Sequence, residues 1–330
     1  MTFFVRSLLL IALLCGLALL VLLHLIRMPG RNYHGALPAL TVDEKIVESN
    51  LRKTVNYIAG SIGERNVIAY QSLEKTAQFI ETSFRTMGYS VQSQEYTVQM
   101  RKVRNLIAEI PGAGKPDEIV VIGAHYDTVA DCPGADDNTS GVAGLLELAR
   151  LLRNSHPERT VRFVAFVNEE PPWFQTQDMG SLVYAKELKR RGADVVAAIS
   201  LETIGMYSDE EGSQQYPAGM GSIYPKKGDF IAFVGYVASA DLVRKSVAAF
   251  RRSVKFPVEG AAVPGAITGV SWSDHWSFWE QGYPAMMITD TAPFRNPNYH
   301  RPSDTPDTLD YDRMARVVSG MKGVIEDLSR

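Results

Sequence analysis

Cysteine is nearly absent from this sequence, since the chain of 330 residues contains only Cys15 and Cys132. Because Cys15 lies inside an apolar run near the N-terminus, an internal disulfide framework is excluded. The fold must therefore be stabilised by a hydrophobic core. The sequence supplies the material for one, because 45% of its residues are hydrophobic. This composition excludes a disordered or fibrous chain.

A basic excess is lacking too. The chain has 34 Lys and Arg residues against 37 Asp and Glu residues, which gives a formal net charge of −3. Proteins that bind nucleic acids usually carry a basic excess or a basic stripe, and neither is visible here. We therefore expect no nucleic-acid partner. Internal repeats and low-complexity tracts are also absent, and the length fits one large domain or two small ones.

Only one long hydrophobic run occurs, SLLLIALLCGLALLVLLHLI over residues 7–26. As a helix it would be about 30 Å long, which matches the hydrocarbon core of a bilayer. Its all-round apolar surface and flanking arginines argue against a buried core helix, and its length and the missing A-x-A site argue against a cleaved signal peptide. We expect a transmembrane anchor over residues 1–30, a linker over 31–40 and one further domain over 41–330.

Beyond residue 40, helix and strand patterns alternate. A T-x-x-E capping box at Thr41–Glu44 predicts the start of a helix. Further helices are expected near residues 72–87, 140–153, 181–191, 240–252 and 311–328. Apolar runs such as EIVVIGAHYD and ADVVAAISLE are typical of buried strands. This alternation predicts a largely parallel sheet covered by helices on both faces. The polar stretch 206–228 is long for a plain connection, so we expect a functional or mobile loop there.

The carboxyl ends of the expected strands carry an unusual set of polar residues. In an open α/β sheet, ligands bind at this edge. The residues gathered there are His125, Asp127, Asp136, Asp137, Glu169, Glu170, Glu202, His300 and Asp304. Each of them alone has an ordinary interpretation as a helix cap or a solvated side chain. Glu169 and Glu170 differ because they follow the buried run VRFVAFV, where ionised carboxylates are unfavourable without a cation. The recurrence at one edge predicts a metal site.

The donor set indicates which metal. Imidazoles and carboxylates without a thiolate suit zinc, and suit cobalt or manganese less well. Three carboxylates and two histidines are too many for one tetrahedral ion, but they suit two ions that share a bridging carboxylate and a bridging water. We therefore expect two Zn²⁺ ions per chain. Asp127 is placed to accept the second ring N–H of His125, and Glu169 is placed to act as a general base.

Several segments resemble one family. Motifs of the co-catalytic dizinc aminopeptidases are similar, in the same order, to GAHYDTVADCPGADDNTSG, VAFVNEEPPW, ISLETIG, SDHWSFWEQGYPA and NYHRPSDTPDT. That family includes bacterial leucyl aminopeptidases, with glutamate carboxypeptidase, glutaminyl cyclase and the transferrin-receptor ectodomain as relatives. The resemblance runs from about residue 45 to 328. It implies a phosphorylase/hydrolase-like three-layer α/β sandwich with a mixed, mostly parallel sheet, and a zinc peptidase domain over 41–330.

The resemblance also implies roles for single residues. It assigns one zinc to His125, Asp137 and Glu202, and the other to Asp137, Glu170 and His300. Glu169 matches the general base, and Asp127 matches the aspartate that orients a ligand histidine. Glu202 departs from the leucyl aminopeptidases, which have Asp at this position. His275 is either part of a capped helix or a residue beside the substrate, and Cys132 either packs in its loop or touches the metal.

The resemblance implies an aminopeptidase that hydrolyses the N-terminal residues of peptides by a metal-bound hydroxide. With the expected anchor, it would be a single-pass membrane protein whose catalytic domain is periplasmic or extracellular, although arginines on both sides of the apolar run leave its orientation open. Two alternatives are a glutaminyl cyclase-like enzyme with one working zinc and a non-catalytic receptor-type ectodomain. The preferred N-terminal residue and the oligomeric state are not readable from the sequence.

Overall fold

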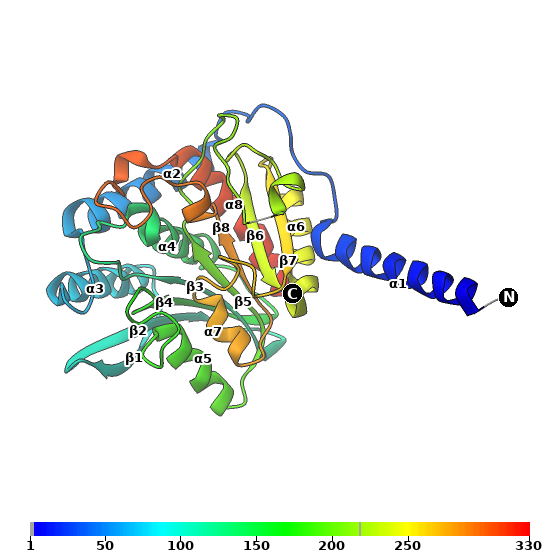
Figure 1. Ribbon diagram of the computed structural model, residues 1–330. Helices are drawn as coiled ribbons and strands as arrows, with labels where there is room; N and C mark the ends of the chain where they lie inside the picture. Colours follow the sequence, from blue (N-terminus) through cyan, green and yellow to red (C-terminus); the bar gives the residue numbers. More distant parts are fainter. Residues whose placement is uncertain (1–2, 218) are drawn as a thin grey trace.

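Figure 1 shows the computed structural model of the chain, which describes residues 3–217 and 219–330, without the side chains of residues 3–6, 15, 18, 19, 21 and 22. The helices are α1 (Phe3–Ile26), α2 (Val42–Val55), α3 (Tyr70–Thr86), α4 (Gly141–Leu152), α5 (Gly180–Arg190), α6 (Ala240–Ser253), α7 (His275–Glu280) and α8 (Tyr311–Leu328). The strands are β1 (Val91–Val98), β2 (Arg101–Ile110), β3 (Lys115–His125), β4 (Arg159–Phe166), β5 (Asp194–Glu202), β6 (Ile231–Tyr236), β7 (Val258–Val263) and β8 (Ala285–Thr289).

The strands form one mixed sheet in the order β1-β2-β4-β3-β5-β8-β6-β7. Its centre, from β4 through β3 and β5 to β8, is parallel. Antiparallel pairs join β1 to β2, β2 to β4 and β6 to β8. The predicted mixed and mostly parallel sheet is therefore confirmed. Because the central strands run in the same direction, their carboxyl ends meet at one edge of the sheet.

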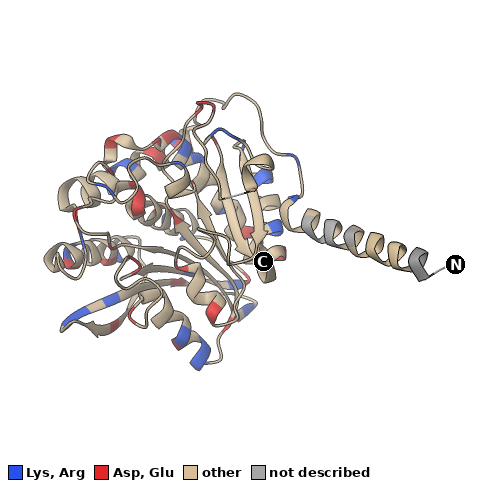
Figure 2. Ribbon diagram, viewed as in Figure 1, with Lys and Arg blue, Asp and Glu red and all other residues tan. Residues whose placement is uncertain are grey.

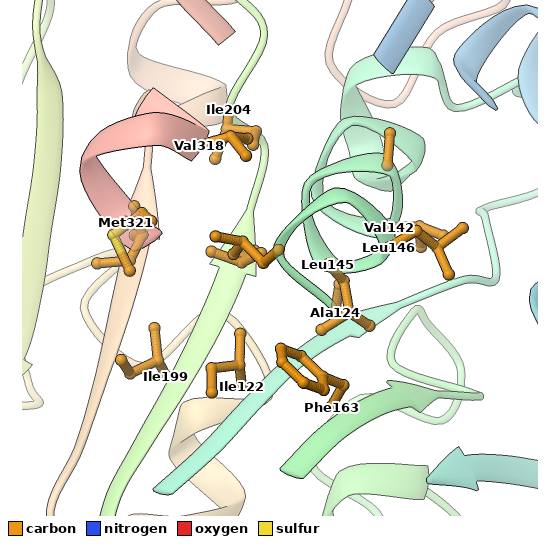
Figure 3. Packing of buried hydrophobic residues seen from close by; sticks show 14 of the residues in the cluster. Ile122, Ala124, Val142, Leu145, Leu146, Phe163, Ile199, Ile204, Val318 and Met321 are labelled. Atoms are coloured by element: carbon orange, nitrogen blue, oxygen red, sulfur yellow. The ribbon is translucent and has the colours of Figure 1, made fainter. Parts of the chain in front are cut away.

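Helices cover both faces of the sheet, as predicted. Along β3, alternate residues belong to different cores: Val120 and Ile122 lie in the cluster with α4 and α8, whereas Val121 lies in the cluster with α5. This alternation follows from the two-residue period of a strand. Figure 3 shows the first core, in which Ile122 and Ile199 lie beneath the apolar side chains of α4 and α8. Two-sided burial explains why the central strands are almost continuously apolar.

The predicted start of helix α2 is confirmed at its cap. The Thr41 side chain accepts a hydrogen bond from the Glu44 backbone at 3.2 Å, and the Glu44 side chain accepts one from the Thr41 backbone at 2.8 Å. Strand β7 and helix α7 were not among the strands and helices expected from the periodicity.

The basic residues do not gather in one place. Figure 2 shows Lys and Arg spread over several helices and the β1–β2 hairpin.

The apolar run near the N-terminus is helical and forms α1, which extends away from the rest of the molecule (Figure 1). A membrane-spanning helix needs about 20 consecutive apolar residues. Over the described residues, no helix meets the length and apolarity that a span requires. This finding contradicts the predicted single-pass membrane localisation, and it gives no support to the predicted transmembrane anchor or the membrane partner.

The segment after α1 packs on strand β7 and helix α6. Met28 is buried, and its side chain comes so close to Gly260 that a Cβ there would lie 2.6 Å from Met28 Cγ. Arg251 donates hydrogen bonds to the carbonyls of Met28 and Pro29. Asn32 accepts a hydrogen bond from the Val258 backbone at 2.9 Å. Part of the expected linker is thus attached to the edge of the sheet.

Candidate metal centre

The predicted site residues lie at the carboxyl edge of the central strands. His125 and Glu202 are the last residues of β3 and β5, and Glu169 and Glu170 follow β4 within four residues. Asp137 lies in the short helical turn η2 (Ala135–Ser140), directly before α4. These side chains are buried, whereas His300 is partly exposed. The topology therefore gathers at one edge residues that are far apart in the sequence.

Asp137 lies between two groups of side chains. Its Oδ1 is 3.2 Å from His125 Nε2, and its Oδ2 is 3.0 Å from His300 Nε2. Glu202 Oε2 lies 3.3 Å from His125 Nε2, and Glu170 Oε2 lies 3.2 Å from His300 Nε2. Possible ligand atoms of His125, Asp137 and Glu202 lie within 4.8 Å of one another, and the same holds for Asp137, Glu170 and His300. We call these five residues the candidate metal centre.

Asp127 contacts both the first histidine and the paired glutamates. Its Oδ1 lies 3.5 Å from His125 Nδ1. Its two oxygens accept hydrogen bonds from the backbone N–H groups of Glu169 and Glu170, both at 3.1 Å. A carboxylate held by two N–H groups has a fixed orientation, and here it also fixes the turn that carries both glutamates. Asp127 therefore lies beside His125, and its orienting role stays a prediction.

Glu169 lies beside the centre. Its Oε2 is 3.8 Å from His125 Nε2, further than the carboxylates of Asp137 and Glu202. Burial raises the pKa of Glu169 well above its usual value. A buried carboxylate with a raised pKa next to a reaction centre is suited to accept and return a proton.

The residues fit a metal ion. Several buried atoms have no hydrogen-bond partner within the described part of the chain, among them Asp137 Oδ1, Glu170 Oε1 and His300 Nε2. Unpaired buried polar atoms are unfavourable, and a bound cation would satisfy them. Burial raises the pKa of Glu170 to about 7. Burial by itself would lower the pKa of His300, but Asp137 and Glu170 raise it to about 10. The centre therefore attracts positive charge, and a divalent ion can replace these protons.

Further polar residues hold the ligands in place, and the sequence patterns did not single out their roles. Asp304 accepts hydrogen bonds from the backbones of Asp136 and Asp137 at 2.9 and 3.1 Å, which fixes the η2 turn. Ser273 donates to Glu202 Oε2 at 2.7 Å. Asn138 donates to the Leu201 carbonyl at 2.8 Å, one residue before Glu202. These contacts join distant segments, so no local spacing indicates them.

The sequence left two interpretations each for His275 and Cys132. His275 is buried in α7, and its Nε2 lies 2.8 Å from the Val270 carbonyl. The expected cap is not formed, because no side chain caps the start of α7. Cys132 donates to the Arg301 carbonyl at 3.1 Å, and burial raises its pKa to about 12. Among the described residues, its sulfur belongs to none of the groups whose possible ligand atoms lie within 4.8 Å of one another. Cys132 therefore packs in its loop.

A pocket opens next to the candidate metal centre. It encloses about 840 Å³ of space, including its open mouth. Its lining includes the candidate metal ligand Glu202 and a second acidic residue, Glu259. The loop 206–228, predicted to be functional or mobile, contributes Gln214, Tyr216 and Tyr224 to the wall. Gln214 donates to Thr291 Oγ1 at 2.8 Å, which ties the loop to the segment after β8. We call this space the side pocket.

The fold and the donor set together define a metal-dependent hydrolase of the α/β class. The chain belongs to peptidase family M28, because the model of "Peptidase family M28" matches residues 105–325, more than half of its length. The predicted family and the predicted class of enzyme, a metallo-aminopeptidase that hydrolyses peptides, are therefore confirmed. Zinc dependence agrees with this family.

Two curated relatives illustrate the similarity. The chain is 42% identical over 280 residues to "Uncharacterized protein YfbL" of Escherichia coli K12, a match that covers 82% of this chain and 85% of the relative. It is 29% identical over 170 residues to "Aminopeptidase YwaD" of Bacillus subtilis, which covers 51% of this chain and 34% of that protein.

Two solved structures share the fold. The zinc aminopeptidase BSAP from Bacillus subtilis superposes with a TM-score of 0.68 at 16% identity, and the match covers 84% of this chain and 94% of that one. Fimbriiglobus ruber glutaminyl cyclase superposes with a TM-score of 0.63 at 21% identity, and the match covers 92% of this chain and 99% of that one.

Proposed function

We propose that this chain is a two-zinc aminopeptidase that removes N-terminal residues from peptides, with its catalytic unit in residues 41–330. The observation that carries the proposal is the position of Asp137. Its two oxygens point to two different histidines, at 3.2 and 3.0 Å, and each histidine has a further carboxylate beside it. This arrangement supports two adjacent ions that share one carboxylate. The ligands would be His125, Asp137 and Glu202 for one ion, and Asp137, Glu170 and His300 for the other.

When bound, zinc would polarise the scissile carbonyl and lower the pKa of the attacking water. Glu169 would accept the proton of that water at its carboxylate and pass it to the leaving amine. Its buried position keeps bulk water away from this transfer. Asp127 would hold His125 through Nδ1 and Glu169 through its backbone N–H. The distance and orientation between the general base Glu169 and the ligand His125 would then be fixed.

Charge supports an amino-terminal substrate. The side pocket has Glu202 and Glu259 in its lining and no Lys, Arg or His among the described lining residues. With zinc bound, the charges of Asp137, Glu170 and Glu202 would be offset by the ions. The acids left to attract the ammonium group at the start of a peptide are then Glu169 beside the centre and Glu259 in the pocket.

The proposal is tested by comparing a free and a blocked amine. Zinc-loaded protein is assayed with leucine p-nitroanilide and with its N-acetyl derivative, before and after chelation. We expect hydrolysis of the free amine only, lost on chelation and restored by zinc. Equal hydrolysis of both substrates would contradict an aminopeptidase.

The similarity in fold to a glutaminyl cyclase makes a second assay necessary. Release of ammonia from peptides that begin with glutamine is measured on the same preparation. We expect N-terminal glutamine to be released as a free amino acid. Ammonia release without peptide hydrolysis would favour the cyclase.

A further inference from the structure

The floor of the side pocket is a single row of residues across four strands. The register pairs Glu202 of β5 with Thr289 of β8, Thr289 with Ala232 of β6, and Ala232 with Glu259 of β7. Residues paired in this way point to the same face of a sheet. All four line the side pocket. One continuous surface therefore leads from a candidate metal ligand to Glu259.

The spacing along this row can be estimated from the sheet. Neighbouring strands lie about 4.8 Å apart, so three steps separate Glu202 from Glu259 by about 14 Å. The next row on the same face is apolar and consists of Met287, Val234 and Ala261. The pocket is thus a long trough with a carboxylate at each end and an apolar middle.

Glu259 has one occupied and one available oxygen. Its Oε1 accepts a hydrogen bond from Asn32 Nδ2 at 2.8 Å. Within the described part of the chain it forms no ion pair. Arg251, the cation whose charge acts on Glu259, is bonded to backbone carbonyls that include those of Pro29 and Val258. The half-buried carboxylate therefore faces the pocket without a counter-ion in contact.

The walls beside Glu259 are aromatic. Tyr216 and Tyr224 are stacked, with ring centroids 5.9 Å apart. Both line the pocket together with Glu259. Aromatic faces and a carboxylate are the two groups that bind a guanidinium most favourably in proteins. Burial raises the pKa of Glu259 to about 6, so the group is ionised at neutral pH and above.

We propose that Glu259 is a specificity-determining residue that selects substrates with a basic N-terminal side chain, arginine above all. This inference rests on the proposed aminopeptidase function. An extended arginine side chain reaches about 7 Å beyond its Cα, which is half of the row of about 14 Å. The rest is covered by two metal–oxygen bonds of about 2 Å each between Glu202 and the substrate carbonyl, and by an ion-pair contact of about 3 Å to Glu259. Its methylene stem covers the apolar middle of the trough while its charged end pairs with the carboxylate. A leucine side chain would instead leave a partly desolvated carboxylate unpaired.

The test uses citrulline, which has nearly the shape of arginine without its charge. The kcat/KM values for arginine and citrulline p-nitroanilides are measured with zinc-loaded wild type, with Glu259→Gln and with Glu95→Gln. Glu95 lies on β1, at the opposite edge of the sheet, and provides the matched control. We expect wild type and the control to favour arginine by about 10- to 100-fold, as one charge-assisted pair allows, and Glu259→Gln to lose most of this ratio. Equal kcat/KM values for the two substrates in wild type would overturn the proposal. So would an unchanged ratio of the arginine to the citrulline value in Glu259→Gln.

A binding measurement separates this inference from the aminopeptidase assignment. Arginine amide and citrulline amide are titrated into the same three proteins by calorimetry, and thermal unfolding verifies that each variant is folded. If no p-nitroanilide is hydrolysed, the aminopeptidase function fails, and tighter binding of arginine amide that depends on Glu259 still supports the pocket assignment. Equal binding of both amides to wild type overturns it.

Discussion

At the scale of single residues, the proposed chemistry depends on Asp137, whose two carboxylate oxygens face two different histidines. Asp137 Oδ1 faces His125 and Oδ2 faces His300, while Asp304 accepts a hydrogen bond from the Asp137 backbone. None of these three contacts involves neighbours in the sequence. The position of Asp137 therefore depends on the whole carboxyl edge of the sheet being formed.

Replacing Glu169 with Gln keeps the volume of the side chain and removes the proton acceptor. We expect bound zinc to be retained and kcat to fall by about 10²–10⁴-fold, the usual contribution of a general base. Metal analysis and steady-state kinetics on the same sample measure both. Glu170→Gln is the comparison, because it should lower zinc content together with activity. Near-normal turnover in Glu169→Gln would rule out the proposed role.

Replacing Glu202 with Ala tests the departure from the aspartate of the leucyl aminopeptidases. Ser273 holds Glu202 Oε2 at 2.7 Å, and that oxygen lies 3.3 Å from His125. We expect Glu202→Ala to bind one zinc per chain instead of two, because Asp137, Glu170 and His300 remain. Glu95→Ala should bind as much zinc as wild type. Two zinc ions per chain in the Glu202 variant would remove this residue from the ligand set.

Most of the candidate centre was predictable from the sequence, because each residue follows a recognisable buried strand. The set of residues followed from the rule that parallel strands end at a common edge, and the division of the ligands between two ions came from the family resemblance. Asp304 was expected at this edge, but its role and that of Ser273 could not be predicted, because both act through contacts with segments 71 or more residues away. Glu259 escaped because it belongs to strand β7, where Gly260 and two alanines weaken the strand pattern.

At the scale of elements, the short helix α7 is stabilised by a neutral histidine. His275 packs edge-on against Trp279, with ring centroids 4.3 Å apart, and its Nε2 lies 2.8 Å from the Val270 carbonyl. Burial lowers the pKa of His275 to about 4. The sequence left open whether this residue meets substrate, because a motif position does not reveal which way a ring points.

This buried histidine should make stability depend on pH. Its pKa in the unfolded chain is about 6.5, so between pH 6.5 and 4 the unfolded state binds more protons, and stability falls as the pH falls. We expect the free energy of unfolding to drop by about 2 kcal/mol more in wild type than in His275→Phe between pH 7 and pH 5. Urea denaturation of both proteins at each pH measures the difference. Identical pH dependence would mean that His275 has the same pKa in the folded and the unfolded protein, and would contradict the expectation.

At the scale of the whole molecule, the edge of the sheet is completed by the segment that follows α1. Met28 fills the space over Gly260, and Asn32 contacts both Val258 and Glu259. The sequence predicted an apolar helix and a linker here, and it could not show that the linker packs, because the polar residue Asn32 has no periodic pattern around it. The same segment holds one oxygen of the proposed specificity residue.

Truncation tests this packing and the domain boundary together. We expect fragments 24–330 and 31–330 both to fold and to hydrolyse substrate, since every residue of the candidate metal centre lies after position 120. The shorter fragment should be less stable by about 1.5–3 kcal/mol, because it loses the burial of Met28. Urea denaturation gives the value, and Met28→Ala in the longer fragment should reproduce most of the loss. Equal stability of the two fragments would mean that this contact contributes nothing, and failure of 31–330 to fold would move the boundary.

The joint action of two zinc ions in one centre is tested most directly by titrating chelator-treated protein with zinc while the hydrolysis of leucine p-nitroanilide is followed. The arrangement of two ligand groups around Asp137 predicts that activity rises until two equivalents of zinc have bound per chain. Activity that is complete at one equivalent, with the second ion neither bound nor needed, would contradict it.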